Sequence, residues 1–364
     1  MNFSSRLLSW YAQNGRQLPW RGKVNPYNVW ISEIILQQTR IEQGIGYYYR
    51  FIDAFPDVRT LAEAPLDKVL RLWQGLGYYS RARNLHQAAG DIVNNLNGVL
   101  PDSYAGWLKI KGVGSYTAAA IASIAFKEPV PALDGNACRV FSRIFALKEV
   151  MDTGKGKKAF RELALEVMDE QNPGDFNQAV MDFGALVCKP VSPLCRECLF
   201  NRECLAFLQK KVQHFPVRKK KPAQRDRYFH YFYFYYPDQN KQTVFFIYKR
   251  TGNDIWKNLY ELPLLETPDP LLPNDLTSLD WWKKFFPDGK GYTFTHAPVF
   301  FRHLLTHQKI HANFYAVRVN PSKTNTFEKA FEKTNREAFD ALPKSGLTLR
   351  YLKTAGKAGK TGQI

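Results

Sequence analysis

The sequence predicts a mainly α-helical domain followed by a smaller α+β domain. Residues 1–208 carry apolar side chains every three or four positions, with Gly, Pro and Asn in the gaps, as amphipathic helices do. Residues 228–350 are instead rich in aromatic and β-branched side chains, which favour strands. Residues 209–227 hold eight Lys or Arg, one Asp and two Pro, which indicates an exposed basic linker. This linker is either a solvated spacer or a segment that contacts the phosphates of a nucleic-acid backbone.

The composition points to a polyanionic partner. The chain has 364 residues, 45% of them hydrophobic, and 51 Lys and Arg against 33 Asp and Glu, a formal net charge of +18. A compact protein this basic repels itself, so nucleic acid explains the charge better than an anionic membrane or a merely basic surface. Neither a signal peptide nor a run of 18 apolar residues is visible. We therefore expect a cytoplasmic protein, associated with the nucleoid through DNA binding, that has no membrane partner.

The first chemical candidate along the chain is Glu33, in the predicted helix VWISEIILQQTR. Its neighbours Trp30, Ile31, Ile34 and Ile35 suggest that this helix is buried. A carboxylate there is either paired with a cation or held with a raised pKa, which suits proton transfer. Amides and a hydroxyl follow it, from Gln37, Gln38 and Thr39.

The next candidate is GLGYYSRARN, residues 75–84, which combines glycines, two tyrosines and two arginines. Aromatic rings beside cations suit base stacking and phosphate contact. A pair of tyrosines packed in a core is the alternative for Tyr78 and Tyr79.

A turn between two helices is predicted in LKIKGVGSYTAAAIA. Glycine lets backbone N–H groups point outward at a helix N-terminus, where a phosphate is favoured. The pattern is that of a helix–hairpin–helix, which grips the DNA backbone without reading its sequence. The residues expected at the backbone are Lys111, Gly112, Val113 and Gly114.

Asp134, in PALDGNACRVFSR, directly precedes a predicted helix. It can serve as an N-cap, and it can also place a negative charge opposite a developing carbocation. The two interpretations are compatible. At about 4 Å and an effective dielectric constant near 20, such a charge is worth roughly 4 kcal/mol.

Four of the five cysteines form a C-x6-C-x2-C-x5-C run: Cys188, Cys195, Cys198 and Cys204. In a reducing compartment this spacing predicts a metal site with all four positions filled by protein. The residues alone leave a tetrahedral zinc site and an iron–sulfur cluster both open. Cys138 lies apart among apolar residues and is predicted to be inert.

In the C-terminal part, residues 228–236 and 243–250 are predicted to form a β-hairpin joined by PDQNKQ. Residues 311–319 read as a further strand, and residues 327–342 as a helix. Residues 351–364 are small and basic, and a flexible tail is predicted there.

Taken together, these residues resemble the MutY family of adenine DNA glycosylases, within the helix–hairpin–helix superfamily that includes endonuclease III. The motifs occur in order over nearly all of the first 208 residues: LPWR (18–21), SEIILQQT (32–39), GLGYYSRARNLH (75–86), KGVGSYTA (111–118), LDGN (133–136) and the four cysteines. The resemblance implies a two-lobed helix–hairpin–helix glycosylase domain with a 4Fe–4S cluster loop, and a Nudix-like α+β domain that recognises the lesion.

The resemblance also implies roles for single residues. Glu33 matches the general acid that protonates the leaving adenine, and Asp134 the carboxylate that stabilises the sugar cation. Asn136 and Tyr116 match residues that hold these acids. The positions matching substrate contacts in the helical domain are Arg16, Trp20, Arg21, Leu36, Gln38, Thr39, Leu76, Tyr78 and Gln178.

In FRHLLTHQKIHANFY (301–315), Thr306 and His307 match a loop that contacts 8-oxoguanine. This loop departs from the family pattern, since Leu305 replaces Phe and Thr306 replaces Ser. The hydroxyl and the imidazole are kept, so lesion contact is still expected. No Nudix catalytic box follows NLYELP (258–263), and nucleotide hydrolysis is not predicted.

Position 116 separates two kinds of chemistry. Bifunctional relatives carry a lysine there, whose amine attacks the sugar and cuts the strand. A tyrosine, whose phenol has a pKa near 10, does not form a Schiff base. Position 116 therefore predicts a monofunctional enzyme that hydrolyses the base alone. The resemblance implies that this base is adenine opposite 8-oxoguanine or guanine in duplex DNA, and we expect the enzyme to be a monomer. The alternatives are an endonuclease III-like glycosylase/lyase that acts on oxidised pyrimidines or T·G mismatches, and a non-enzymatic DNA-binding module with zinc.

Overall fold

The computed structural model describes residues 3–22, 24–219, 223–271 and 273–358. The chain forms two compact units. One contains residues 1–63 and 84–220, and the other contains residues 64–83 and 221–364. The short segment 64–83 is thus grouped with the C-terminal part of the chain.

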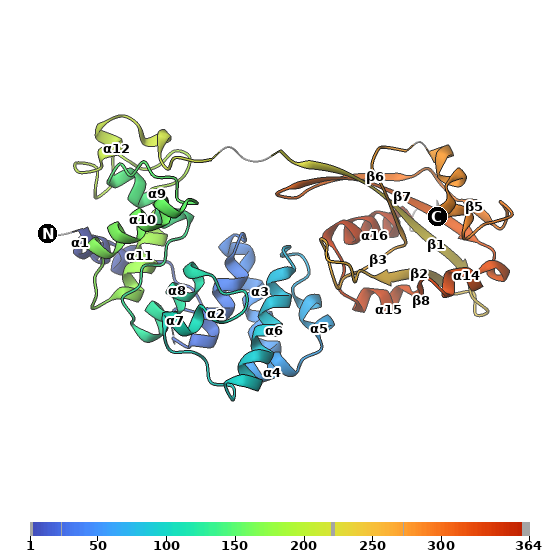
Figure 1. The fold of residues 1–364 in the computed structure, drawn as a ribbon, viewed down its shortest axis with the longest axis horizontal. Helices are drawn as coiled ribbons and strands as arrows, with labels where there is room; N and C mark the ends of the chain where they lie inside the picture. The colour runs from blue at the N-terminus through green and yellow to red at the C-terminus, as the bar shows by residue number, and fades with distance from the viewer. Residues whose placement is uncertain (1–2, 23, 220–222, 272, 359–364) are drawn as a thin grey trace. The chain divides into compact units, whose positions relative to one another are not determined.

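The first unit is helical in its described residues (Figure 1). Its helices are α1 (Phe3–Asn14), α2 (Pro26–Leu36), α3 (Ile41–Ala54), α4 (Val58–Glu63), α7 (Tyr104–Trp107), α8 (Ser115–Phe126), α9 (Gly135–Ile144), α10 (Gly154–Val167), α11 (Pro173–Leu186), α12 (Leu205–Leu208) and the 3₁₀ turn η1 (Val212–His214). Helix α6 (Ser80–Asn95) begins in the segment 64–83 and continues into this unit.

Helices α1, α9, α10 and α11 share one hydrophobic core. Phe141, Phe160, Phe176 and Phe183 are at most 1% exposed within it, and Leu7 of α1 is fully buried there. Burying side chains of this size contributes roughly 1.5–3 kcal/mol each. This core fixes the start of α9 against α11, where several of the predicted site residues lie.

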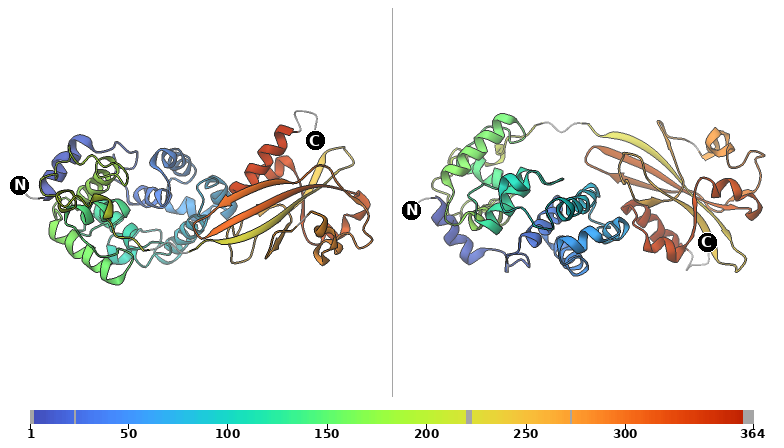
Figure 2. Two further views of the ribbon diagram at one scale, coloured as in Figure 1. Left: turned by 90° about the horizontal axis from the view of Figure 1, so that it is seen from above. Right: turned by 60° about the horizontal axis from the view of Figure 1, so that its bottom comes forward.

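The second unit is built on one mixed sheet. Its strands are β1 (Arg225–Pro237), β2 (Thr243–Lys249), β3 (Tyr260–Glu261), β4 (Leu264–Thr267), β5 (Tyr292–Phe294), β6 (Val299–Leu304), β7 (Gln308–Val319) and β8 (Glu332–Asn335). The order β3-β2-β1-β7-β5 is completed by β4 on β1, β6 on β7 and β8 on β2. The long strands β1 and β7 are paired in parallel, and Figure 2 shows them side by side.

Side chains of β1 alternate between the two faces of this sheet, because the strand period is two. Phe232 and Phe234 pack against Trp282 of α13 (Asp280–Lys283) on one face. On the other face, α16 (Gly346–Ala358) covers the sheet, with Tyr351 stacked on Phe314 of β7 at 4.3 Å. The remaining elements are α5 (Leu66–Leu72), η2 (Pro273–Ser278), η3 (Pro321–Lys323), α14 (Asn325–Glu328) and α15 (Arg336–Ala341).

The predicted hairpin and the strand at 311–319 are confirmed as β1, β2 and β7. The single helix predicted over 327–342 is wrong, because β8 interrupts it and pairs with β2. Asn335 then starts α15 by accepting a hydrogen bond from the Ala338 N–H. Here the open edge of β2 outweighs local helix propensity.

Two more segments differ from the prediction. The expected tail is helical up to Ala358, with Tyr351 and Leu352 buried, and residues 359–364 lie outside the described residues. Part of the expected linker is not exposed, since Phe215 is 6% exposed in the core of the first unit. Residues 220–222 of that linker also lie outside the described part. Among the helices that the structure describes, none is both long and apolar enough to cross a membrane.

Candidate active site

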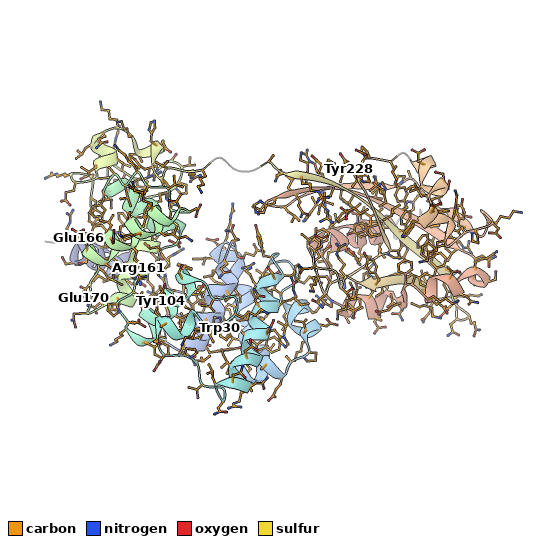
Figure 3. All side chains as sticks on the ribbon, viewed as in Figure 1. Trp30, Tyr104, Arg161, Glu166, Glu170 and Tyr228 are labelled. Atoms are coloured by element: carbon orange, nitrogen blue, oxygen red, sulfur yellow. The ribbon has the colours of Figure 1, made fainter. Side chains whose placement is uncertain are left out.

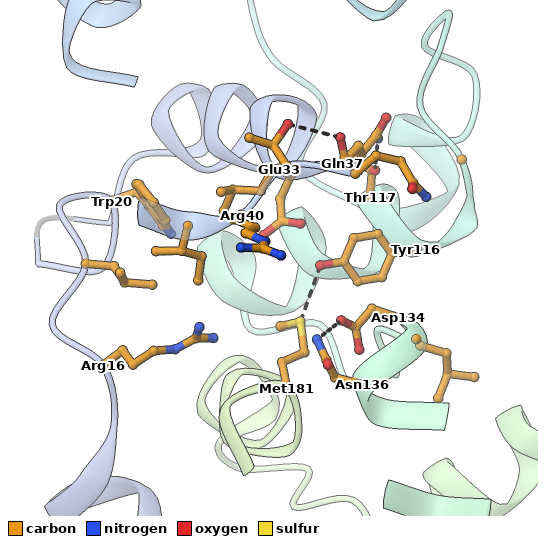
Figure 4. Close-up of a pocket in the computed structure, with 18 of the residues that line it drawn as sticks. Arg16, Trp20, Glu33, Gln37, Arg40, Tyr116, Thr117, Asp134, Asn136 and Met181 are labelled. Carbon is orange, nitrogen blue, oxygen red and sulfur yellow. Dashed lines mark hydrogen bonds between the residues drawn. The ribbon is translucent and has the colours of Figure 1, made fainter. Parts of the chain in front are cut away.

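A cavity of about 720 Å³ lies between α2, α8, α9 and α11 in the first unit. We call it the Glu33 pocket (Figure 4). The predicted site residues that line it are Arg16, Trp20, Arg21, Glu33, Leu36, Gln38, Thr39, Gly114, Tyr116, Asp134 and Asn136. Residues from four separate stretches of sequence thus meet around one space, which is of a size that suits a small ligand.

Glu33 reaches the pocket from the buried helix α2. Pro26 starts this helix, and Asn25 caps it by accepting hydrogen bonds from the N–H groups of Tyr27 and Asn28. Glu33 itself is only 8% exposed. Burial raises the pKa of its carboxyl to about 7, against the lowering effects of a Tyr116 hydrogen bond and the Arg21 charge. At neutral pH a large fraction of this carboxyl therefore carries a proton.

Asp134 is the N-cap of α9, as predicted. Its carboxylate accepts a hydrogen bond of 2.7 Å from the Ala137 N–H and another of 2.7 Å from the Asn136 amide. Burial raises the pKa of Asp134, whereas these two hydrogen bonds lower it. Asp134 therefore caps the helix and contacts Asn136 at the same time. One carboxylate oxygen accepts from the Ala137 N–H and the other accepts from the Asn136 amide.

Asn136 is held in one orientation. Its amide oxygen accepts a 2.8 Å hydrogen bond from the Arg139 guanidinium, which also donates to the carbonyls of Gly184 and Cys188. Arginine only donates hydrogen bonds, so the amide oxygen must face Arg139 and the NH₂ must face Asp134. Arg139 is thus a supporting residue that the sequence analysis did not find.

Tyr116, in the first turn of α8, places its hydroxyl between Glu33 and Asp134 (Figure 4). The hydroxyl oxygen lies 3.3 Å from Met181 Sδ. Burial, and then the two neighbouring carboxylates, raise the pKa of this phenol well above its ordinary value, so it stays neutral. No lysine lines the pocket in the described part of the chain.

Arg16 and Arg21 share a partner that the sequence analysis missed. Asp182 of α11 is fully buried and accepts from Arg16 Nε at 2.8 Å and from Arg21 Nη1 at 2.8 Å. Although burial raises the pKa of Asp182, the hydrogen bonds from Arg21 and Arg16 hold it below its ordinary value. The signal was present in QAVMDFGAL, since an acid inside an apolar helix needs a cationic partner.

Gln37 is a further residue without a predicted role. Its Nε2 donates to Thr117 Oγ1 at 3.2 Å, which joins the end of α2 to α8 (Figure 4). The next residue, Gln38, lines the pocket with a φ of +59°. The chain therefore turns sharply just after α2, and this turn exposes the Gln38 side chain.

Several predicted residues do not line the Glu33 pocket. Gln178 is buried on α11, 8% exposed, and is not among the lining residues that the structure describes. Leu76, Tyr78, Thr306 and His307 all belong to the second unit.

Tyr78 meets Thr306 in a cavity of about 530 Å³ within the second unit. The two hydroxyl oxygens are 2.6 Å apart, and His307 lines the same cavity. Tyr78 is 50% exposed, whereas Tyr79 is 5% exposed and donates its hydroxyl to the Lys344 carbonyl. Of the two alternatives for this tyrosine pair, exposure for base stacking fits Tyr78 and packing in a core fits Tyr79.

The turn before α8 has the expected hairpin geometry. Gly112 has a φ of +78°, and a Cβ there would stand 2.7 Å from Asn84 Cβ. Gly114 is the N-cap of α8 and provides no side-chain hydrogen bond to the helix. The first N–H groups of α8 are therefore not capped by a side chain, a condition that suits a phosphate. Lys111, before the turn, donates to Gln87.

The four clustered cysteines line one small cavity. Arg143 Nη1 donates to Cys188 Sγ at 3.5 Å, and the Phe200 N–H donates to Cys198 Sγ at 3.4 Å. Among the described residues, no three His, Cys, Asp or Glu side chains are grouped so as to hold one metal ion. N–H donors aimed at sulfur nevertheless suit thiolates that bind a shared group. Cys138 is buried elsewhere.

Comparisons with known proteins show which family the chain resembles. A family model described as "HhH-GPD superfamily base excision DNA repair protein" matches residues 31–166. The adenine DNA glycosylase of Buchnera aphidicola subsp. Acyrthosiphon pisum is 35% identical over 273 residues, which cover 74% of this chain and 76% of that protein. The adenine DNA glycosylase of Homo sapiens is 41% identical over 213 residues, which cover 56% of this chain and 39% of that protein.

Solved structures show the same fold over more than half of this chain. A thermostable thymine-DNA glycosylase matches with a TM-score of 0.53 and 28% identity, over 57% of this chain and 95% of that one. A trapped endonuclease III–DNA complex matches with a TM-score of 0.50 and 20% identity, over 57% of this chain and 94% of that one. With this fold, and with a relative that is 35% identical and aligned over 76% of its own length, the chain belongs to the MutY family of adenine DNA glycosylases and is a DNA N-glycosylase.

Proposed function

We propose that the protein hydrolyses the N-glycosidic bond of adenine opposite 8-oxoguanine or guanine in duplex DNA. The relatives named adenine DNA glycosylase support adenine as the base, and the net charge of +18 suits a DNA partner. The observation that carries the proposal is the arrangement of Glu33 and Asp134 around one pocket, with the Tyr116 hydroxyl between them.

The reaction begins with the flipping of the target nucleotide into the Glu33 pocket, because its glycosidic bond is inaccessible inside the duplex. Protonated Glu33 donates its proton to N7 of adenine, and the C1′–N9 bond breaks with its electron pair leaving on the base. The carboxylate of Asp134 stabilises the sugar cation. Water then adds at C1′ and gives its proton to Glu33, which restores the acid.

The product of this reaction is an abasic site in an uncut strand. Strand cleavage through a Schiff base needs an amine at the sugar, and position 116 carries a neutral phenol instead. The other residues of the Glu33 pocket are proposed to contact the substrate without taking part in the chemical steps. Trp20, Leu36 and Arg21 line the space that the adenine occupies. Gln38 enters the base stack beside the lesion, and Thr39 contacts the substrate.

Recognition of the opposite base is proposed for the second unit. Tyr78 enters the base stack, and Thr306 and His307 contact 8-oxoguanine. The 2.6 Å contact between the Tyr78 and Thr306 hydroxyls supports a joint role for the two residues. Leu76 is 7% exposed and is proposed to hold the Tyr78 loop in place.

The cysteines are proposed to hold a 4Fe–4S cluster, which when bound would keep the loop 188–204 rigid. Purified protein is then expected to contain about four iron atoms per chain. Cys198→Ser should lower the iron content and the affinity for DNA, whereas Cys138→Ser should leave both unchanged. Zinc in place of iron in the purified protein would contradict this assignment.

The test of the main proposal is an excision assay on duplexes in which both bases of the mispair are varied. Release of adenine opposite 8-oxoguanine and guanine is expected, without borohydride-trapped adducts. Asp134→Asn should abolish excision but keep duplex binding. Excision of oxidised pyrimidines, or a trapped covalent adduct, would favour the endonuclease III-like alternative instead.

A further inference from the structure

A second cavity, of about 240 Å³, adjoins the Glu33 pocket in the first unit. We call it the Lys157 cavity. It shares Ser115, Tyr116 and Leu133 with the Glu33 pocket. The start of α8 and the residue before Asp134 therefore border both spaces. None of the roles proposed above uses the remaining wall of this cavity.

The remaining wall is apolar inside and cationic at the rim. Val130, Pro131 and Met151 line it together with Tyr104, and α10 contributes Lys157 and Arg161. Both cations are exposed, and the Arg161 guanidinium lies 5.8 Å from the centre of the Tyr104 ring (Figure 3). No acidic residue lines the cavity in the described part of the chain. This wall suits a ligand that joins an anionic group to an apolar body.

The start of α10 is held in a fixed position, which fixes the backbone that carries Lys157. Thr153 caps the helix by accepting a 2.9 Å hydrogen bond from the Gly156 N–H. A Cβ at Gly156 would stand 1.9 Å from the Val150 carbonyl oxygen, so the turn packs too tightly for another residue.

The lysines of α10 differ in their partners. Lys155 pairs with Glu149 at 3.6 Å and Lys158 pairs with Glu162 at 3.8 Å. Among the described residues, neither Lys157 nor Arg161 forms an ion pair. The two cations that face the cavity are thus the ones left available to an anion.

We propose that the Lys157 cavity binds the phosphate and deoxyribose next to the flipped nucleotide, on the strand that contains the target base. This inference rests on the proposed function only in requiring that a nucleotide enters the Glu33 pocket. The strand must leave that pocket along one of its walls, and the wall at Ser115 leads to the cavity. The phosphate meets Lys157 and Arg161, while the sugar packs on the apolar residues.

The test measures binding of the full-length protein to a duplex with a non-hydrolysable adenine analogue, over a range of NaCl concentrations. The double variant Lys157→Gln/Arg161→Gln should lower the slope of log K against log salt by about 1–2, since each phosphate contact contributes about one. The matched control, Lys155→Gln/Lys158→Gln, removes the same charge from the same helix and should change the slope far less. Equal slopes for the two double variants would overturn the proposal.

A second arm locates the contact. Methylphosphonates are placed one at a time at the phosphates flanking the analogue. The affinity of the wild type should fall when one of these phosphates is replaced. Replacing the same phosphate should not lower the affinity of the Lys157→Gln/Arg161→Gln variant any further. Additive losses at every position would contradict the proposal. Inorganic phosphate or dAMP is also tested as a competitor of the duplex. If either competes with the duplex for the wild type but not for the double variant, the cavity is instead a site for free anions. These experiments measure binding and not excision. A failure of the proposed activity would therefore be seen in the excision assay and would be distinguishable from a failure of this inference.

Discussion

Glu33 differs from an ordinary surface glutamate only in its surroundings. The apolar residues of α2 remove water from the carboxyl and raise its pKa to about 7, and Tyr116 and Arg21 limit the increase. The pattern WISEII predicted the burial, since a helix apolar on all sides is a buried one. It did not predict the partners, because they come from residues 21 and 116, which lie outside this helix.

The raised pKa of Glu33 gives a pH dependence with a defined sign. In the proposed mechanism Glu33 must be protonated to act, so the excision rate should fall as the pH rises through about 7. Tyr116→Phe removes a hydrogen bond that lowers this pKa, and the fall should therefore move to higher pH. Single-turnover rates between pH 5 and 9 measure both effects. A rate that stays level between pH 6 and 9 would exclude Glu33 as the proton donor.

Asp182 provides a prediction about stability. Asp182→Ala would leave Arg16 and Arg21 without their shared carboxylate, and removing one partner of a buried ion pair costs about 3–5 kcal/mol. The exposed ends of the two arginines place the expected loss at the lower end, about 3 kcal/mol. Urea unfolding measures it. Asp175→Ala, an exposed acid of the same helix, should cost under about 1 kcal/mol, and a similar loss in both variants would refute the pairing argument.

Helices and strands were predicted well where one periodic pattern continues for two turns or more. The stretches around Glu33, Tyr116 and the β1–β2 hairpin are of this kind. The pattern failed at residues 327–342, because pairing with β2 is a contact across the sheet that a local pattern does not encode. It failed again at 351–358, since only the packed sheet shows that Tyr351 has a ring to stack on.

The turn before α8 allows a test of one short motif. Gly112→Ala introduces a Cβ at a φ of +78° and 2.7 Å from Asn84, and should destabilise the protein by about 1–3 kcal/mol while weakening DNA binding. Thermal unfolding and duplex binding measure the two losses. Gly90→Ala, within α6 and with open space at its Cβ, should be neutral or slightly stabilising. A Gly112→Ala protein as stable as the Gly90→Ala protein would show that the turn tolerates a side chain.

The two compact units do not follow the linear order of the chain. Residues 64–83 read as part of a helical stretch, yet they contact the C-terminal part at several points. Lys249 pairs with Asp67 at 2.8 Å, and the backbone of Lys344 bonds with Gln74 and Tyr79. Helical periodicity identifies an apolar face but not the partner that covers it, so the sequence could not predict this grouping.

These contacts predict a coupling between the segment and the C-terminal part. The double variant Gln74→Ala/Tyr79→Phe removes two hydrogen bonds to Lys344 and should lower the free energy of local opening at 64–83 by about 1–3 kcal/mol. Hydrogen–deuterium exchange of those amides measures it. On the proposed function, excision of adenine opposite 8-oxoguanine should fall with it, because Tyr78 lies in the segment. Unchanged exchange at 64–83, with the exposed Tyr49→Phe as the reference, would contradict the coupling.

The parallel pairing of β1 with β7 has a consequence for synthesis in the cell. Arg225 pairs with Gln308, so β1 leaves the ribosome 83 residues (308 minus 225) before its partner exists. At about 5–20 residues per second, the aromatic stretch YFHYFYFYY waits roughly 4–17 seconds with one edge uncovered. The run RKKK, residues 218–221, lies just before this stretch and repels other nascent chains during the interval, as gatekeeper charges do. Neutralising those charges should lower the soluble yield of newly made protein more than it lowers the stability of the folded state.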